Sequence, residues 1–409
     1  MSFLKTRILG MLAWALALLY GTFVMLYLTC QYVRGKITTS ITRDVPPPCL
    51  HDPLLGRHKF FRLKQNMKLH YVESGNHENP LVILIHGSPD FWFTWRKQIP
   101  ALSTDYWVVA LDLRGCGDSE GPYFRTQYTT AELASDVAEL IRLLVAKPAH
   151  LVCAGAGGQV GWHMAYHYPH LISKLVLIHS PHPYIIRHHF HQAWSHYLKA
   201  WYLIFLKLPL LPEVAAHAND SGVIDKYLKK LVKTKAVDEE DVEAYKFAFS
   251  RKEDWTGTFH ILRSLDLKPL DSTEPLPDVI TKPTLLIMGD EDTLMPLETA
   301  YRSAEYVERI TIKPVQGPGY LCHVSDAQQV NTILGNFLRE LPWKPLSPLE
   351  PSKSSSTLVG RVMGASLTAV STTVNKTTGA FEMTKSIPGG LYGIAQATIK
   401  AAESKLGLE

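Results

Sequence analysis

Hydrophobic residues along this chain fall into short continuous runs that alternate with helical stretches. Five such runs are LVILIH (81–86), WVVALDL (107–113), HLVCA (150–154), KLVLIH (174–179) and TLLIM (284–288). Near-continuous apolar runs of this length are typical of parallel strands buried on both faces of a sheet. Because the runs alternate with helical segments, the pattern predicts a doubly wound α/β sheet.

A long helical insertion separates the fourth run from the fifth. It occupies about residues 181–281 and is rich in aromatic side chains. Within it, DEEDVEAYKFAFS (238–250) places acidic residues in a first turn with an apolar face behind them, as expected of an amphipathic helix. The insertion is therefore predicted to form a lid over the sheet.

The N-terminal segment has no charged residue from Ile8 to Val33. This run exceeds the ~20 residues that a helix needs to cross hydrocarbon, so it predicts a transmembrane anchor at 8–33. A secretory signal is the alternative, but the run is too long for one and no small-x-small cleavage site follows it. Residues 34–57 contain three consecutive prolines, which suits a spacer that lifts the domain from the bilayer. Flanking positive charges nearly balance, so orientation stays open.

The chain changes character beyond the predicted domain at 58–345. Residues 346–409 are rich in Ser, Thr, Gly and Ala with isolated large apolar residues. Three approximate eleven-residue repeats can be read there, beginning at Val359, Val370 and Phe381. Such a repeat would align these residues along one stripe of an amphipathic helix. Pro388 and the two glycines after it favour a disordered tail instead, and both alternatives stay open.

Composition and charge exclude several classes of protein. The 409 residues are 46% hydrophobic and 20% charged, which is typical of a globular protein with a membrane segment. The net charge of +4 comes from basic residues spread along the chain, so nucleic acid is not an expected partner. The five cysteines have no CxxC or CxxxH spacing, and the histidine cluster at 187–196 lacks carboxylate support. We therefore expect no disulfide framework, no metal and no cofactor.

Four motifs, taken in order, resemble those of epoxide hydrolases, a family of the α/β-hydrolase superfamily. HGSPDFWFTWR (86–96) resembles that family's His-Gly-x-Pro-x loop and its aromatic run. The others are DLRGCGDSEGP (112–122), VGWHMAYHYPHLISKLVLIHSPHP (160–183) and LLIMGDEDTLM (285–295). The resemblance covers roughly 58–345 and is greatest to membrane-anchored, single-pass members. It implies an α/β-hydrolase fold, a mostly parallel sheet with a helical lid insertion.

In that family, an aspartate on the sharp turn after the fifth strand attacks the epoxide. A histidine, supported by a second carboxylate, then directs water at the ester intermediate, and two lid tyrosines hold the epoxide oxygen. The turn admits only small residues beside the nucleophile. Here it reads CAGAGG (153–158), which puts Gly155 at the aspartate position between Cys153 and Gly157. No side chain is available there to attack.

The remaining family positions are partly substituted. The stretch 325–338 places Tyr320 at the histidine position, and tyrosine is a poor base near pH 7. His323, three residues on, is interpreted as a surface or capping histidine. Asp292 matches the supporting carboxylate, with no partner left to orient. The two lid positions hold Tyr202 and Leu262.

Three of these five chemical groups are therefore missing, and loss of a nucleophile alone costs about 10⁶ in rate in hydrolases. We predict a catalytically inactive, membrane-anchored member of the family whose cavity binds an apolar or lipid ligand, or a protein partner. The expected cavity lining comprises His86, Gly87, Ser88, Phe91, Trp92, Trp95 and Tyr202.

Two alternatives stay open. One is an active hydrolase of epoxides or esters that uses a rearranged site, with Asp292 acting beside His323 or Cys322. The other is an organising role in which the tail attaches to lipid surfaces and the domain presents partners. We expect membrane lipid as a partner and a single-pass location in the endoplasmic reticulum or a lipid-droplet-associated membrane. The sequence identifies no protein partner.

Overall fold

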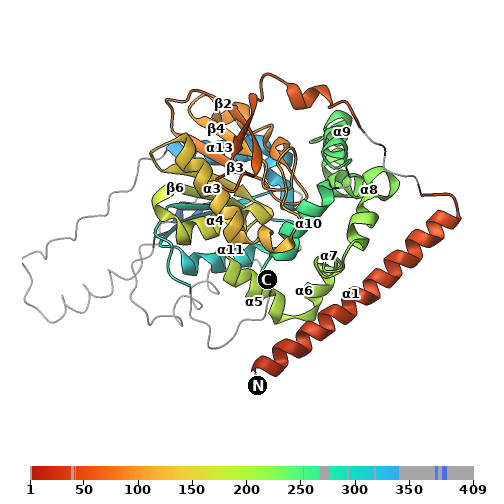
Figure 1. Ribbon diagram of the computed structural model, residues 1–409. Helices are drawn as coiled ribbons and strands as arrows, with labels where there is room; N and C mark the ends of the chain where they lie inside the picture. Colours follow the sequence, from red (N-terminus) through yellow and green to blue (C-terminus); the bar gives the residue numbers. More distant parts are fainter. Residues whose placement is uncertain are drawn as a thin grey trace, which may run out of the picture.

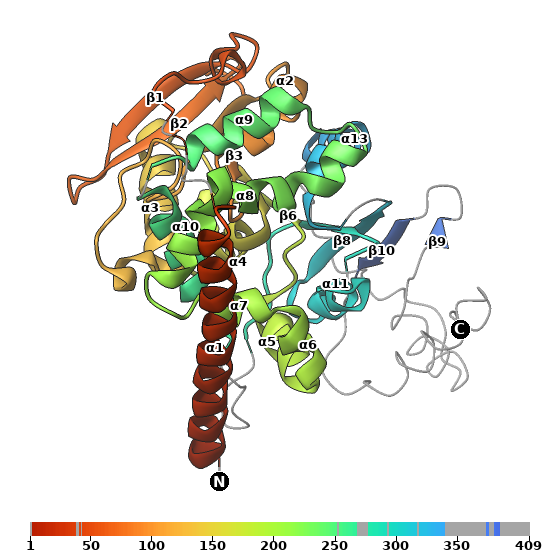
Figure 2. The same cartoon turned by 90° about the vertical axis from the view of Figure 1, so that its right-hand side faces the viewer.

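A single mixed sheet forms the centre of the molecule, with strand order β1-β2-β4-β3-β5-β6-β7-β8-β10-β9 (Figures 1 and 2). The computed structural model describes residues 2–37, 41, 43–251, 253–267, 277–292, 294–316, 319–339, 374–375 and 380–384. The strands are β1 (Arg57–Arg62), β2 (Lys68–Ser74), β3 (Leu81–Ile85), β4 (Trp107–Leu111), β5 (Ala149–Ala154), β6 (Ile172–Ile178), β7 (Thr284–Gly289), β8 (Arg309–Val315), β9 (Val374–Asn375) and β10 (Ala380–Thr384).

The six strands from β4 to β8 are parallel, and β2 and then β1 extend the sheet with antiparallel pairing. The five apolar runs of the sequence correspond to β3 through β7. Every residue of β3, β4, β5 and β7 is buried, as parallel strands covered on both faces require. The predicted α/β fold is confirmed.

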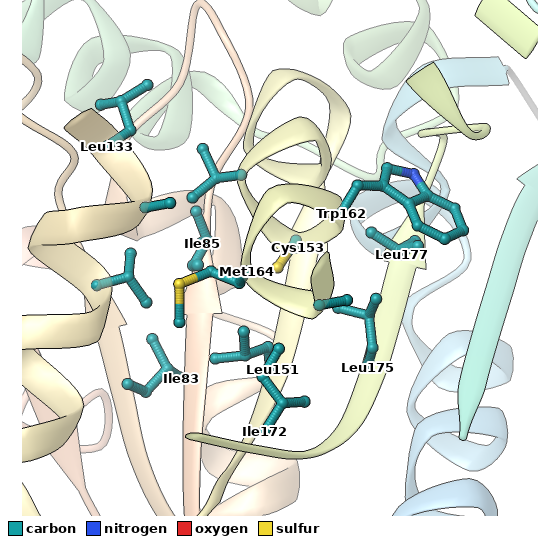
Figure 3. Close-up of a cluster of buried hydrophobic side chains, with 14 of the residues drawn as sticks. Ile83, Ile85, Leu133, Leu151, Cys153, Trp162, Met164, Ile172, Leu175 and Leu177 are labelled. Carbon is teal, nitrogen blue, oxygen red and sulfur yellow. The ribbon is translucent and has the colours of Figure 1, made fainter. Parts of the chain in front are cut away.

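Helices cover both faces of the sheet. Their bounds are α2 (Ile99–Leu102), α3 (Thr130–Leu144), α4 (Gly155–His167), α11 (Leu297–Ser303), α12 (Cys322–Ser325) and α13 (Ala327–Arg339). Ile83 and Ile85 of β3 pack in the cluster that holds α3 and α4, whereas Val82 and Leu84 pack in the cluster that holds α13. Figure 3 shows the first cluster between β3, β5, β6 and α4. The alternation places one core on each face.

Among the described residues between β6 and β7, six helices form the lid. They are α5 (Pro183–Gln192), α6 (Trp194–Lys199), α7 (Trp201–Phe205), α8 (Leu211–Lys233), α9 (Glu239–Ala248) and α10 (Asp254–Ser264). The helix predicted at 238–250 is confirmed as α9, where Asp238 and Asp241 form a reciprocal capping box. Helix α8 is kinked at Asn219, Asp220 and Ser221, all of which have positive φ.

The N-terminal helix α1 (Ser2–Val33) is a candidate membrane span, because Trp14–Val33 is long and apolar enough to cross a bilayer. It runs alongside α7 and α8, and its N-terminal end projects beyond the domain (Figures 1 and 2). Ala17 of α1 is buried with Phe205 and Leu208 of the lid. Gly21 allows this approach, because a Cβ there would lie 2.4 Å from Leu208 Cδ1.

The segment after α1 does not behave as the free spacer that its prolines suggested. Arg43 pairs with Asp220 of α8 and with Glu243 of α9. The backbone N–H of Cys49 donates to the Glu240 carboxylate at 3.0 Å. Acidic side chains on the lid therefore hold this segment against the domain.

Most of the tail at 346–409 lies outside the described residues. Within it, β10 pairs antiparallel with β8, and β9 pairs with β10. Val374 and Phe381 are thus in extended backbone where the eleven-residue repeat predicts helix. For the rest of the tail, including Val359 and Val370, the helical interpretation stays a prediction.

Candidate functional site

The turn from β5 into α4 keeps the shape of a nucleophile elbow. Helix α4 begins at Gly155, directly after the last residue of β5, and Gly155 has a φ of +50°. This left-handed backbone is strained for residues with a side chain. A Cβ at Gly155 would meet only Gly87 Cα, at 3.6 Å. The turn therefore has room for a side chain but presents none.

The neighbouring small residues are required by close backbone packing. A Cβ at Gly157 would lie 2.2 Å from the carbonyl oxygen of His86, and one at Gly158 would lie 2.3 Å from Ser180 Cβ. Cys153 is fully buried among the core side chains beneath the elbow, where burial raises the pKa of its thiol (Figure 3). It cannot replace the absent nucleophile.

A cavity of about 1340 Å³ lies between the elbow and the lid. Its lining brings together all five family-equivalent positions, namely Gly155, Tyr202, Leu262, Asp292 and Tyr320. They come from α4, α7, α10, the loop after β7 and the loop after β8. The site predicted from the sequence is thus one place in the structure, although its reactive side chains are substituted.

The expected lining of this cavity needs correction. Gly87, Ser88 and Tyr202 do line it. Phe91, Trp92 and Trp95 are instead buried in the hydrophobic core, because their short helical turn packs inward against the sheet and lid.

His86 also has a structural role instead of lining the cavity. It is fully buried, and its Nδ1 lies 2.7 Å from the carbonyl oxygen of Gly87. The Leu113 N–H donates to its Nε2 at 3.0 Å. The ring therefore fixes the loop that faces the elbow, and burial lowers its pKa.

Asp292 has a partner that the sequence did not reveal. Its Oδ2 lies 3.5 Å from Nδ1 of His179, and its Oδ1 accepts from the backbone N–H groups of Leu294 and Met295, at 2.9 Å each. Burial lowers the pKa of His179, but Cys322 and Asp292 together raise it to about 9. A histidine directly after a predicted strand was the available signal, since such positions meet at the carboxyl edge of a parallel sheet.

The spacing of His323 suggested a surface or capping residue, and this interpretation is wrong. His323 is fully buried at the start of the short helix α12, stacks near Trp95 and lies 2.9 Å from the Thr94 hydroxyl through Nε2. Burial lowers its pKa to about 3, so it stays neutral. It also lines the cavity.

Asp90 and two lid tyrosines form a second polar group in the cavity wall. The hydroxyls of Tyr245 and Tyr227 donate to the Asp90 carboxylate at 2.6 and 3.4 Å. Burial raises the pKa of Asp90 to about 7, although the hydrogen bonds from Tyr245, Thr94 and the Phe91 backbone oppose the shift. Tyr320 packs on Tyr227 and donates to its backbone carbonyl.

The two tyrosines at family positions are weak acids in this setting. Burial raises the pKa of Tyr202 to about 12, with Asp292 and Tyr320 contributing. Burial likewise raises the pKa of Tyr320 to about 12. Both stay protonated near neutral pH, and neither offers a base. Tyr202 offers a hydrogen-bond donor to the cavity, whereas Tyr320 already donates to the carbonyl of Tyr227 and offers only an acceptor oxygen.

Among the described residues, no group of three or more His, Cys, Asp or Glu side chains is placed to hold a metal ion. In the histidine cluster at 187–196, His189 and His196 stack on one another at 3.9 Å between ring centroids. His191 lies 3.1 Å from the carbonyl oxygen of Leu267. These contacts are structural.

Comparison with known proteins agrees with this geometry. Residues 80–318 match the family model described as the alpha/beta hydrolase fold. A human protein named epoxide hydrolase 4 is 33% identical over 309 residues, which are 73% of this chain and 83% of the human protein. Caenorhabditis elegans epoxide hydrolase 1 is 29% identical over 287 residues, 69% of this chain and 70% of the relative.

Solved structures give the same result. A structure of an epoxide hydrolase from Bacillus megaterium superposes with a TM-score of 0.62 at 26% identity, covering 69% of this chain and all of that one. The chain therefore belongs to the epoxide hydrolase-like family of α/β hydrolases.

Proposed function

We propose that this chain is a catalytically inactive, membrane-anchored member of its family that binds an apolar ligand under its lid. The observation that carries the proposal is Gly155, which occupies a nucleophile elbow of intact shape, faces the cavity and has no reactive side chain. Epoxide opening by the family route needs a carboxylate at this point to form the ester.

Neither Asp292, at the supporting-carboxylate position of the family, nor Asp90 in the cavity wall is free to substitute for it. Asp292 Oδ1 accepts two backbone hydrogen bonds while Oδ2 faces His179. Asp90 accepts from two tyrosine hydroxyls, one on each oxygen. Burial of Asp90 also favours its neutral form.

A general base is also lacking near neutral pH. Tyr320 stands at the histidine position and keeps its proton. His179 is already protonated, because its pKa is about 9. His323 is neutral, but its Nε2 is engaged by Thr94 and the ring is fully buried.

The cavity itself suits an apolar guest. At about 1340 Å³ it exceeds the roughly 300–1,000 Å³ that holds a drug-sized ligand. Large apolar side chains from the lid and sheet form much of its wall, including Phe190, Leu203, Phe205, Phe259, Leu262 and Leu294. The hydroxyl of Tyr202 supplies a donor, and the phenolic oxygen of Tyr320 supplies an acceptor, for one polar end of a ligand.

Two assays on the full-length protein in detergent test this proposal. Incubation with trans-stilbene oxide should yield no diol, and peptide mapping should find no adduct between Leu151 and Gln159. Fluorescence titration with cis-parinaric acid should show saturable binding. Ala156→Trp, which places bulk in the cavity wall beside the elbow, should weaken that binding at least tenfold.

A rebuilt variant provides the positive control. Gly155→Asp, Tyr320→His and Leu262→Tyr together restore nucleophile, base and second lid tyrosine, and should give weak diol formation. Diol from the natural protein that Asp292→Asn abolishes would overturn the proposal. Failure to bind cis-parinaric acid would remove its ligand-binding half.

One contact favours a second candidate, an ester hydrolase with Cys322 as nucleophile. His179 lies 3.5 Å from Asp292, and Cys322 is among the groups that raise the pKa of that histidine. The thiolate would attack an ester carbonyl, the alcohol would leave with a proton from His179, and water would hydrolyse the thioester to the acid. Complete burial of Cys322 argues against it. Hydrolysis of p-nitrophenyl butyrate that Cys322→Ala abolishes would support this candidate.

A further inference from the structure

The lid contacts α1 within the part of that helix that must lie in hydrocarbon if α1 spans a membrane. The uncharged run from Ile8 to Val33 is several residues longer than the ~20 needed for a span. Every window of about 20 residues within that run includes residues 14–27. The residues of α1 that meet the lid are Leu16, Ala17, Tyr20, Gly21 and Val24. All of them lie inside 14–27.

The lid residues on the other side of this contact are apolar. Ile204, Phe205 and Leu208 are buried against α1, and the Trp201 ring lies 5.9 Å from that of Tyr20. Figure 1 shows α7 and the start of α8 following α1 along part of its length. If α1 is in the bilayer as docked here, residues 201–216 of the lid are at the same depth.

The outer surface of residues 201–216, the lid segment, has the character that such a depth requires. Leu210 is 76% exposed and Val214 is 59% exposed. Glu213 is paired with the buried Arg263, at 2.6 Å. Lys207 is exposed, and a lysine can extend its ammonium group to the headgroup region along its apolar stem. Exposed apolar side chains of this kind mark a contact surface, here continuous with the apolar face of α1.

The cavity reaches this same boundary. Its lining includes Val24, Tyr27 and Leu28 of α1 together with Trp201, Tyr202 and Phe205 of α7. Val24 and Tyr27 fall within 14–27, so the cavity meets α1 at the level of the acyl chains. A ligand could then pass from bilayer to cavity without crossing water.

We propose that the lid segment is seated in the leaflet on the domain side of the membrane, and that the cavity admits the acyl chain of a membrane lipid between α1 and α7. This inference rests on the proposed binding of an apolar ligand and names both its chemical class and its route. The polar end of the lipid would face the hydroxyl groups of Tyr202 and Tyr320.

Depth-dependent quenching tests the seating of the lid. The full chain carries Cys30→Ser and Cys49→Ser, because the other three cysteines are buried. A fluorophore is attached at Leu210→Cys or at Val214→Cys, and the protein is reconstituted in phosphatidylcholine vesicles with spin-labelled acyl chains. The matched control is Leu143→Cys. Leu143 is 63% exposed and lies near the end of α3, directly before β5 begins, whereas the lid follows the end of β6.

Acyl-chain quenchers should reduce the signal at positions 210 and 214 at least threefold more than at 143. Equal quenching at all three positions would overturn the seating of the lid. Replacement of Gly21 by Leu, whose side chain would collide with Leu208, should reduce the quenching at 210 by separating α1 from the lid.

Photolabelling tests the route. Phosphatidylcholine with a diazirine on one acyl chain should label Met295, which lines the cavity, as well as α1. Ala156→Trp should remove the adduct at Met295 and keep those on α1. Labelling restricted to α1, in protein that still binds cis-parinaric acid, would overturn the route while leaving the proposed function intact. Loss of cis-parinaric acid binding would instead mean that the proposed function fails.

Discussion

Arg43, in the segment after α1, donates two hydrogen bonds of 2.8 Å to the carboxylate of Asp220 in the kink of α8. Asn219, Asp220 and Ser221 have φ values of 56°, 55° and 56°, a region that costs L residues free energy. Arg43 also donates to Glu243 of α9. One guanidinium therefore fixes a strained lid backbone and links it to the segment that follows α1.

Replacement of Arg43 by Gln should destabilise the lid by about 1.5–3 kcal/mol, because the hydrogen bonds lost are to charged groups. Hydrogen exchange over 215–225 should accelerate, and thermal unfolding should move to lower temperature. The control is Arg339→Gln, which breaks an exposed ion pair with Asp105 and should lower the stability much less.

The Arg43–Asp220 pair predicts that the protein loses stability at acid pH. Arg43 holds the pKa of Asp220 below its usual value, so its stabilising contribution is present above about pH 4 and is lost as pH falls further. Arg43→Gln should therefore lose less stability than the natural protein between pH 5 and 3. Parallel acid curves for the two proteins would contradict this assignment.

The His179–Asp292 pair predicts that the protein loses stability at alkaline pH. The pKa of His179 is raised to about 9, so its contribution is complete below about pH 6.5 and disappears as pH rises through 9. Unfolding of the natural protein compared with His179→Gln should show a difference of up to about 3 kcal/mol that vanishes over this window. His77→Gln, at a mostly exposed histidine paired with Glu73, should leave the pH profile unchanged.

Asp90 should make stability depend on pH in the range between these acid and alkaline transitions. Burial raises its pKa to about 7, so the folded state favours the protonated form and stability falls as pH rises from about 4 to 7. Asp90→Asn keeps an acceptor for Tyr245 and removes the charge, so its stability should change less over this range. An unchanged slope in this variant would assign the effect to another carboxyl, such as Asp254.

The two elbow glycines should differ in what they tolerate. Gly155→Ala should cost only about 1–2 kcal/mol, since the space is open and only its positive φ opposes a side chain. Gly157→Ala should cost clearly more, because its Cβ would lie 2.2 Å from the His86 carbonyl oxygen. Chemical unfolding of the two variants measures the difference, and equal costs would mean that the turn relaxes around either residue.

The sequence predicted the fully buried strands well and the partly exposed strands poorly. Strands β3 to β7 are recognisable in the sequence as continuous apolar runs, because both faces of each strand are covered. Strand β1 has one buried residue and β8 alternates, so neither forms such a run. Their pairing is decided by contacts with β2 and β7, which are distant in sequence or lack a local pattern.

For the site, the resemblance located each position, but the residues around it could not be assigned partners. The Asp292–His179 contact joins the ends of two strands, and only the parallel register brings them together. The aromatic residues Phe91, Trp92 and Trp95 illustrate the opposite error. Their spacing in the sequence does not show whether the side chains point into the cavity or into the core. A short helical turn buries all three in the core.

Because α1 supplies part of the cavity wall, α1 and the hydrolase domain are not separable units. Removal of residues 1–33 would uncover Ile204, Phe205 and Leu208, and would leave the cavity without Val24, Tyr27 and Leu28 on one side. A truncated protein would then have a cavity open to water on one side and a newly exposed apolar surface that favours aggregation. Ligand affinities measured on it would therefore not be those of the full-length chain.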